Sequence, residues 1–76
     1  MPIVSDVTEG DFILRMIGKE KLWLENYSSI TEYTDTDIIV VSRHNQIHIC
    51  GERLRIEYYG MVEMKVSGCI EKIQLV

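Results

Sequence analysis

The sequence predicts an all-β domain, a small antiparallel meander of five to seven short strands that forms a curled sheet, a barrel or a sandwich. Short β-branched and aromatic runs alternate with isolated glycines along the chain, which is typical of strands joined by tight turns. No window of about eleven residues shows the spacing of an amphipathic helix. The connections are too short for parallel crossovers, except in a short β-solenoid, which is the alternative fold.

The chain has 76 residues, which is enough for one domain. We place this single β domain at residues 11–76. Residues 1–10 show weak periodicity and little apolar surface to bury, so we expect a flexible N-terminal lead-in there.

Charge and cysteine content narrow the class of protein. The net charge is −4, the sum of −5 over residues 1–38 and +1 over residues 39–76. An acidic chain lacks the clustered Lys and Arg that phosphate backbones require, so no nucleic acid is expected. Two cysteines and the absence of a signal-peptide pattern favour a cytoplasmic protein with reduced thiols. No apolar run approaches the roughly 20 residues that span a bilayer, so no direct membrane insertion is expected.

The first strands are predicted at residues 11–17 and 22–26, joined as a hairpin by the polar, glycine-containing turn 18–21. A third strand is predicted within residues 27–33, where β-branched and aromatic residues occur. Residues 34–37 carry two aspartates and two threonines and predict a turn.

Residues 38–41 are all β-branched and apolar on both parities, which predicts a strand covered on both faces. Residues 43–46 then turn the chain. Residues 46–59 contain two apolar pairs, 47/49 and 54/56, on opposite parities. Since side chains alternate along a strand, we expect two short strands that reverse at Gly51, so that both pairs face one core.

A strand at residues 61–66 follows, and Ser67-Gly68 is expected to be a turn or kink. In the closing segment, Ile70 and Ile73 are three apart. A β-bulge near Glu71-Lys72 would return Ile73 and Leu75 to the core face.

The alternation predicts which apolar side chains form the core and which point away from it. The predicted core comprises Leu22, Leu24, Ile38, Val40, Ile47, Ile49, Leu54, Ile56, Val62, Met64 and Val66. The outward set includes Trp23, Ile39, Val41, Tyr59 and Met61. Either this set forms an exposed patch for a partner or a second copy, or curling of the sheet and the N-terminal segment cover it.

We expect neither a metal site nor catalysis. His48, Cys50 and Cys69, with His44 nearby, provide one His-x-Cys and a lone cysteine, whereas zinc sites show paired close spacings. No nucleophile motif and no phosphate-binding glycine loop occurs, and a meander of this size offers little room for a small-molecule substrate. We therefore expect no cofactor and no enzymatic activity.

The order of several segments resembles the YabP/YqfC family of sporulation proteins. The matching segments are Ile17-Gly18-x-x-x-Leu22-x-Leu24-Glu25-Asn26-Tyr27, Ile30-x-Glu32-Tyr33-Thr34, Ile38-x-Val40, Ile47-x-Ile49-x-Gly51-x-x-Leu54-x-Ile56 and Val66-x-Gly68-x-Ile70-x-x-Ile73-x-Leu75. Cys69 departs from the polar residue usual at that position, and the turn at 43–45 lacks the usual glycine.

The resemblance implies a small protein of endospore-forming Firmicutes, made in the mother cell and without known catalysis. It implies a structural or adaptor role in assembly of the spore envelope or coat, in the cytoplasm or peripheral at the forespore outer membrane or coat. The expected partner is a second copy or a membrane-anchored sporulation protein. We predict that Trp23, Tyr27, Tyr33, Tyr59 and Met61 contribute to contact. The alternative function is a small β-barrel that binds nucleic acid through Arg43, Arg53 and Arg55 beside Tyr58 or Tyr59.

Overall fold

A computed structural model describes residues 12–75, and these residues contain six antiparallel strands and no helix. The strands are β1 (Ile13–Ile17), β2 (Lys21–Glu25), β3 (Ser29–Tyr33), β4 (Asp37–Val41), β5 (Gln46–Tyr59) and β6 (Glu63–Leu75). They form one sheet in the order β1-β2-β6-β5-β4-β3. The predicted all-β meander is confirmed, including the first hairpin, whereas the lead-in predicted at residues 1–10 lies outside the described residues.

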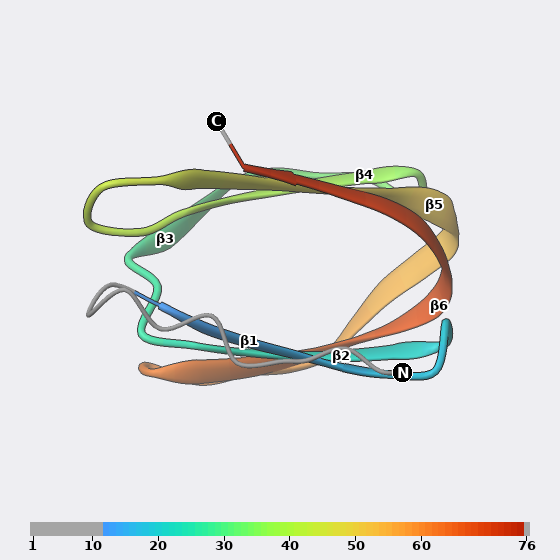
Figure 1. Cartoon of the computed structure of the whole chain (residues 1–76), viewed down its shortest axis with the longest axis horizontal. Helices are drawn as coiled ribbons and strands as arrows, with labels where there is room; N and C mark the ends of the chain where they lie inside the picture. The colour runs from blue at the N-terminus through green and yellow to red at the C-terminus, as the bar shows by residue number, and fades with distance from the viewer. Residues whose placement is uncertain (1–11, 76) are drawn as a thin grey trace.

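The sheet folds over into two layers because its two longest strands, β5 and β6, bend sharply (Figure 1). One layer holds β3 and β4 with one half of each long strand, and the other holds β1 and β2 with the remaining halves. Strands β1 and β3 are the two edges of the sheet. The sheet is therefore curled but not closed, and the barrel form assumed for the nucleic-acid alternative does not occur in residues 12–75.

The predicted reversal at Gly51 is wrong, since β5 runs as one strand from Gln46 to Tyr59. The change of parity comes from a bulge instead. The register passes from the pair Glu52–Cys69 to the pair Arg55–Ser67, so β5 contains one residue more than β6 between them. Arg53 has a positive φ of 53° there. Such a bulge bends the strand and moves later side chains to the other face, so Ile47, Ile49 and Leu54 are all buried.

Two glycines let the long strands approach closely at this bend. A Cβ atom on Gly51 would lie 2.0 Å from the carbonyl oxygen of Cys69. A Cβ atom on Gly68 would lie 2.4 Å from the carbonyl oxygen of Arg53, and Gly68 has a φ of +129°. The predicted turn or kink at Ser67-Gly68 is thus a bend within continuous β6.

The loops of the two outer hairpins hold the bend from either side through backbone hydrogen bonds. The β3–β4 loop accepts bonds from β5, and the β1–β2 loop accepts bonds from β6. These bonds are Gly51 N–Thr36 O (3.1 Å), Leu54 N–Asp35 O (2.8 Å), Gly68 N–Glu20 O (3.1 Å) and Ile70 N–Lys19 O (2.9 Å). Backbone groups freed by the bulges are therefore satisfied within the fold.

The core lies between the two layers. Its buried hydrophobic residues are Phe12, Leu22, Leu24, Tyr27, Ile38, Val40, Ile47, Ile49, Leu54, Met64, Val66 and Ile70. The predicted core is correct except for exposed Val62, which lies in the β5–β6 turn, and Ile56, which is only partly buried. The predicted bulge is confirmed, because Glu71 is the extra residue of β6 between the pairs Cys50–Lys72 and Gly51–Ile70. Ile73 packs against the core as predicted, but the predicted return of Leu75 to the core face is wrong, since Leu75 is half-exposed near the end of β6.

Candidate interaction surface

The end of β5 and the turn that follows it carry four exposed apolar or aromatic residues, which we call the hairpin-tip surface: Tyr58, Tyr59, Met61 and Val62. The Met61 side chain is the most exposed of them, at 94%. The backbone turns here because Gly60 N–H donates to the Glu63 carbonyl at 2.8 Å. This turn lies at the opposite end of the lower layer from the bend (Figure 1).

Tyr27 anchors the hairpin tip from beneath. It lies in the connection between β2 and β3 and is 8% exposed. Its single hydroxyl proton is shared between the carbonyl oxygens of Gly60 and Glu63, the latter at 2.9 Å. Its ring stacks on that of Tyr59, with 5.7 Å between centroids. A shallow hollow beside this stack is lined by Tyr27, Ser28, Tyr59, Gly60 and Met61.

The position of Tyr27 also changes its chemistry. Burial, followed by the nearby Tyr59, raises the pKa of the Tyr27 hydroxyl above its usual value. The hydroxyl therefore stays protonated and remains a donor to the turn. Hydrogen bonds thus hold the β5–β6 turn in place, and the apolar side chains of the hairpin-tip surface are exposed on an ordered turn.

Three of the five predicted contact residues come together in this structure. Tyr27, Tyr59 and Met61 line the same hollow, with Tyr27 as the buried support and the other two at the surface. Tyr58 and Val62 were missed as members of the surface. Gly60 is the sequence signal that could have identified them, because residues next to a predicted hairpin turn are usually exposed.

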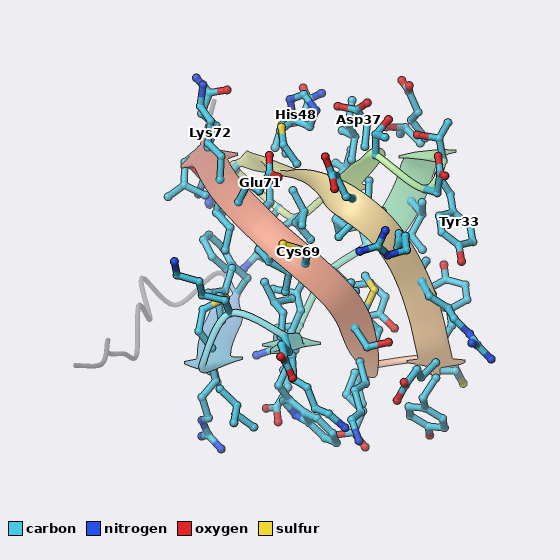
Figure 2. The ribbon with its side chains drawn as sticks, turned by 90° about the vertical axis from the view of Figure 1, so that its right-hand side faces the viewer. Tyr33, Asp37, His48, Cys69, Glu71 and Lys72 are labelled. Atoms are coloured by element: carbon cyan, nitrogen blue, oxygen red, sulfur yellow. The ribbon has the colours of Figure 1, made fainter. Side chains whose placement is uncertain are left out.

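The other two predicted contact residues lie elsewhere. Trp23 is half-buried on the outer face of β2, and its indole N–H donates to the Glu25 carboxylate at 2.9 Å. Tyr33 lies at the end of β3 on the side of the bend (Figure 2), where its hydroxyl accepts a hydrogen bond from Ile56 N–H at 3.0 Å. Neither residue extends the hairpin-tip surface.

A second group of polar side chains lies on the outer face of the other layer. Asp37 on β4 is in register with Cys50 on β5, and His48 lies two residues before Cys50 on the same face. His48 Nε2 is 2.9 Å from Asp37 Oδ1. One ligand atom from each of Asp37, His48 and Cys50 lies within 4.8 Å of the other two. The three residues are partly buried.

The environment of this cluster shifts two pKa values in opposite directions. The hydrogen bond from the Thr36 hydroxyl, followed by that from His48, holds the pKa of Asp37 below its usual value. Burial, followed by the negative charge of Asp37, raises the pKa of the Cys50 thiol. Asp37 is therefore ionised at neutral pH, and it lies between a hydroxyl and an imidazole.

Cys69 lies outside this cluster, although it was considered together with His48 and Cys50. It is exposed on β6 at the bend (Figure 2), and both cysteines are free thiols. A surface hollow next to Cys69 is lined by Lys19, Glu20, Lys21, Arg53, Ser67, Gly68 and Cys69.

The fold and the hairpin tip define a small, two-layered β domain with an ordered apolar turn. The family model of the YabP family matches residues 9–76, and the chain belongs to this family. Membership suggests a sporulation-related protein, and the YabP family is not a known enzyme family. No curated protein and no solved structure matches the chain. Residues 12–75 include no helix with the length and apolar character of a membrane span.

Proposed function

We propose that this protein is a non-enzymatic structural or adaptor component of spore envelope or coat assembly that acts in the mother cell through protein–protein contacts. The observation that carries the proposal is the hairpin-tip surface, which exposes Tyr59, Met61 and Val62 on a turn fixed by Tyr27. Aromatic residues and Met are enriched in the cores of protein interfaces. Family membership supports the link to sporulation.

The pre-formed geometry of the tip supports a binding role. A residue held in place before binding loses little conformational freedom on association. Tyr59 is stacked on a buried ring, so its orientation is set in the free protein. The partner is a second copy or a membrane-anchored sporulation protein that receives the tip in an apolar recess.

The test uses a fluorescent fusion of the whole chain in sporulating cells, together with light scattering of the purified protein. We expect the wild-type fusion to collect at the mother-cell face of the forespore. Tyr59→Ala and Met61→Ser should make it diffuse. A buried aromatic anchor contributes about 2 kcal/mol, or roughly 30-fold in affinity, to an interface.

Ile17→Ser is the matched control, since Ile17 is an apolar residue about as exposed as Tyr59 and lies at the bend end of β1. It should leave localisation unchanged. If the partner is a second copy, light scattering will show a wild-type oligomer and a Tyr59→Ala monomer. A diffuse wild-type fusion, or equal loss in the Ile17 variant, would contradict the proposal.

A further inference from the structure

The cluster of Asp37, His48 and Cys50 brings three different metal-binding groups to one place on the sheet. Two of the groups come from β5 and the third from the neighbouring β4. Their ligand atoms lie within 4.8 Å of one another. Adjacent strands fix this arrangement, because the backbone pairing of β4 with β5 sets the positions of Asp37 and Cys50.

The carboxylate of Asp37 is oriented before any ligand arrives. The Thr36 hydroxyl donates to Asp37 Oδ2 at 2.8 Å, which leaves Oδ1 directed to His48. Asp37 N–H in turn donates to the Thr34 hydroxyl at 2.9 Å. Outer hydrogen bonds of this kind hold the ligating carboxylates of metal sites in position. The site also lies next to the bend, where the Gly51 N–H bond to Thr36 O ties the loop to β5.

We propose that Asp37, His48 and Cys50 form a zinc site, with water as the fourth ligand. Zinc accepts thiolate, imidazole and carboxylate in one tetrahedral shell, and such atoms lie about 3.3–3.6 Å apart in that shell. The 2.9 Å between His48 Nε2 and Asp37 Oδ1 and the 4.8 Å bound on the whole cluster bracket this spacing.

The exposure of the site suits a three-ligand centre. The side chains of His48 and Asp37 are 29% and 38% exposed, so water can reach the open position. Lys72 lies in register with Cys50 on β6, and its side chain is seen on the same side of the molecule as His48 (Figure 2). The positive charge of Lys72 only partly opposes burial and Asp37, which together raise the pKa of the Cys50 thiol, so zinc itself must displace the thiol proton on binding. Bound zinc would join β4 to β5 beside the bend, in addition to the backbone ladder.

The experiment titrates the whole, reduced, metal-free protein with zinc alone by calorimetry. Cobalt(II) serves as a spectroscopic probe, since a bound thiolate gives a charge-transfer band. We expect one zinc per chain and a cobalt spectrum with that band. Cys50→Ser and His48→Gln should abolish binding in the measurable range. Thr36→Val, which removes the hydrogen bond to Asp37 and a longer one of 3.4 Å with the Thr34 hydroxyl but no proposed ligand, should weaken zinc binding by about 10-fold.

Cys69→Ser is the matched control, because it removes the other cysteine at a position outside the cluster. It should bind zinc as the wild type does. Circular dichroism of each variant checks that the sheet has formed, and the cobalt spectrum of the wild type tests the thiolate ligand without any substitution. The proposal is wrong if no zinc binds, if the cobalt spectrum lacks the thiolate band, or if Cys69→Ser loses as much affinity as Cys50→Ser.

Discussion

Replacement of Gly51 by alanine tests the physical origin of the two-layer fold. The added Cβ atom would lie 2.0 Å from the Cys69 carbonyl oxygen and 3.1 Å from the Ile70 Cα atom. Both neighbours are backbone atoms of β6, so no side-chain rotation relieves the contact. The two long strands must separate at the bend by more than about 1 Å, since ordinary contacts begin at about 3.5 Å.

The expected loss of stability follows from this displacement. Overpacking by one methyl group commonly costs about 1–3 kcal/mol where side chains can adjust. Here the backbone must move and its neighbouring hydrogen bonds must lengthen, so we expect at least about 3 kcal/mol. A domain of 76 residues has a total stability of about 4–11 kcal/mol. The variant should therefore unfold at a much lower urea concentration, or fail to fold.

Gly18→Ala is the comparison variant, because Gly18 has a φ of +63° and a Cβ atom added there would meet nothing within 4 Å. The substitution should lower the free energy of unfolding by about 1–2 kcal/mol, because alanine disfavours a positive φ and makes no close contact there. Urea unfolding followed by circular dichroism measures both. A Gly51→Ala loss below about 1 kcal/mol, or one no larger than that of Gly18→Ala, would refute the close approach as the determinant of the bend.

Three further outcomes are expected. Tyr27→Phe removes the hydroxyl that donates to the Gly60 and Glu63 carbonyls and should lower the free energy of unfolding, measured with urea, by about 1–3 kcal/mol. The pKa of Tyr27 is higher in the folded protein than in the unfolded chain, where it is about 10. The stability that this difference contributes is complete below the unfolded pKa and is lost as pH rises through the folded pKa, so tyrosinate absorbance and unfolding should rise together at alkaline pH. The Tyr27→Phe variant should lack this pH dependence. Leu24→Ala should lower the free energy of unfolding by about 2–5 kcal/mol, because Leu24 is fully buried. Leu75→Ala, at a half-exposed position, should lower it by less than about 1 kcal/mol, and equal losses would contradict the assigned core.

Much of the fold was predictable because strand signals are local. The β-branched run of β4 and the hairpin of β1 and β2 each follow from a few neighbouring residues. The bulge at Glu71 was also predictable, since a spacing of three between Ile70 and Ile73 requires an extra residue if both are to face the core. Burial of Tyr27 was not, because it depends on contacts with Gly60 and Glu63 far along the chain.

The error at Gly51 has a specific cause. A change of apolar parity satisfies the core equally well through a hairpin or through a bulge, because both move later side chains to the required face. Glycine is compatible with either. What decides between them is the close approach of β6, which lies about twenty residues further along the chain and makes Gly51 a crossing point rather than a turn.

The same error concealed the cluster of Asp37, His48 and Cys50. If the chain reversed at Gly51, Cys50 would lie beside a turn, and residues 46–50 would pair with the segment that follows. Because β5 instead continues, its first half pairs with β4, and this pairing puts Asp37 opposite Cys50 and close to His48. His-x-Cys alone was too weak a signal for a metal site. The third member of the cluster, Asp37, lies where the sequence predicts only a turn. The cluster could therefore be recognised only once the pairing of β4 with β5 was known.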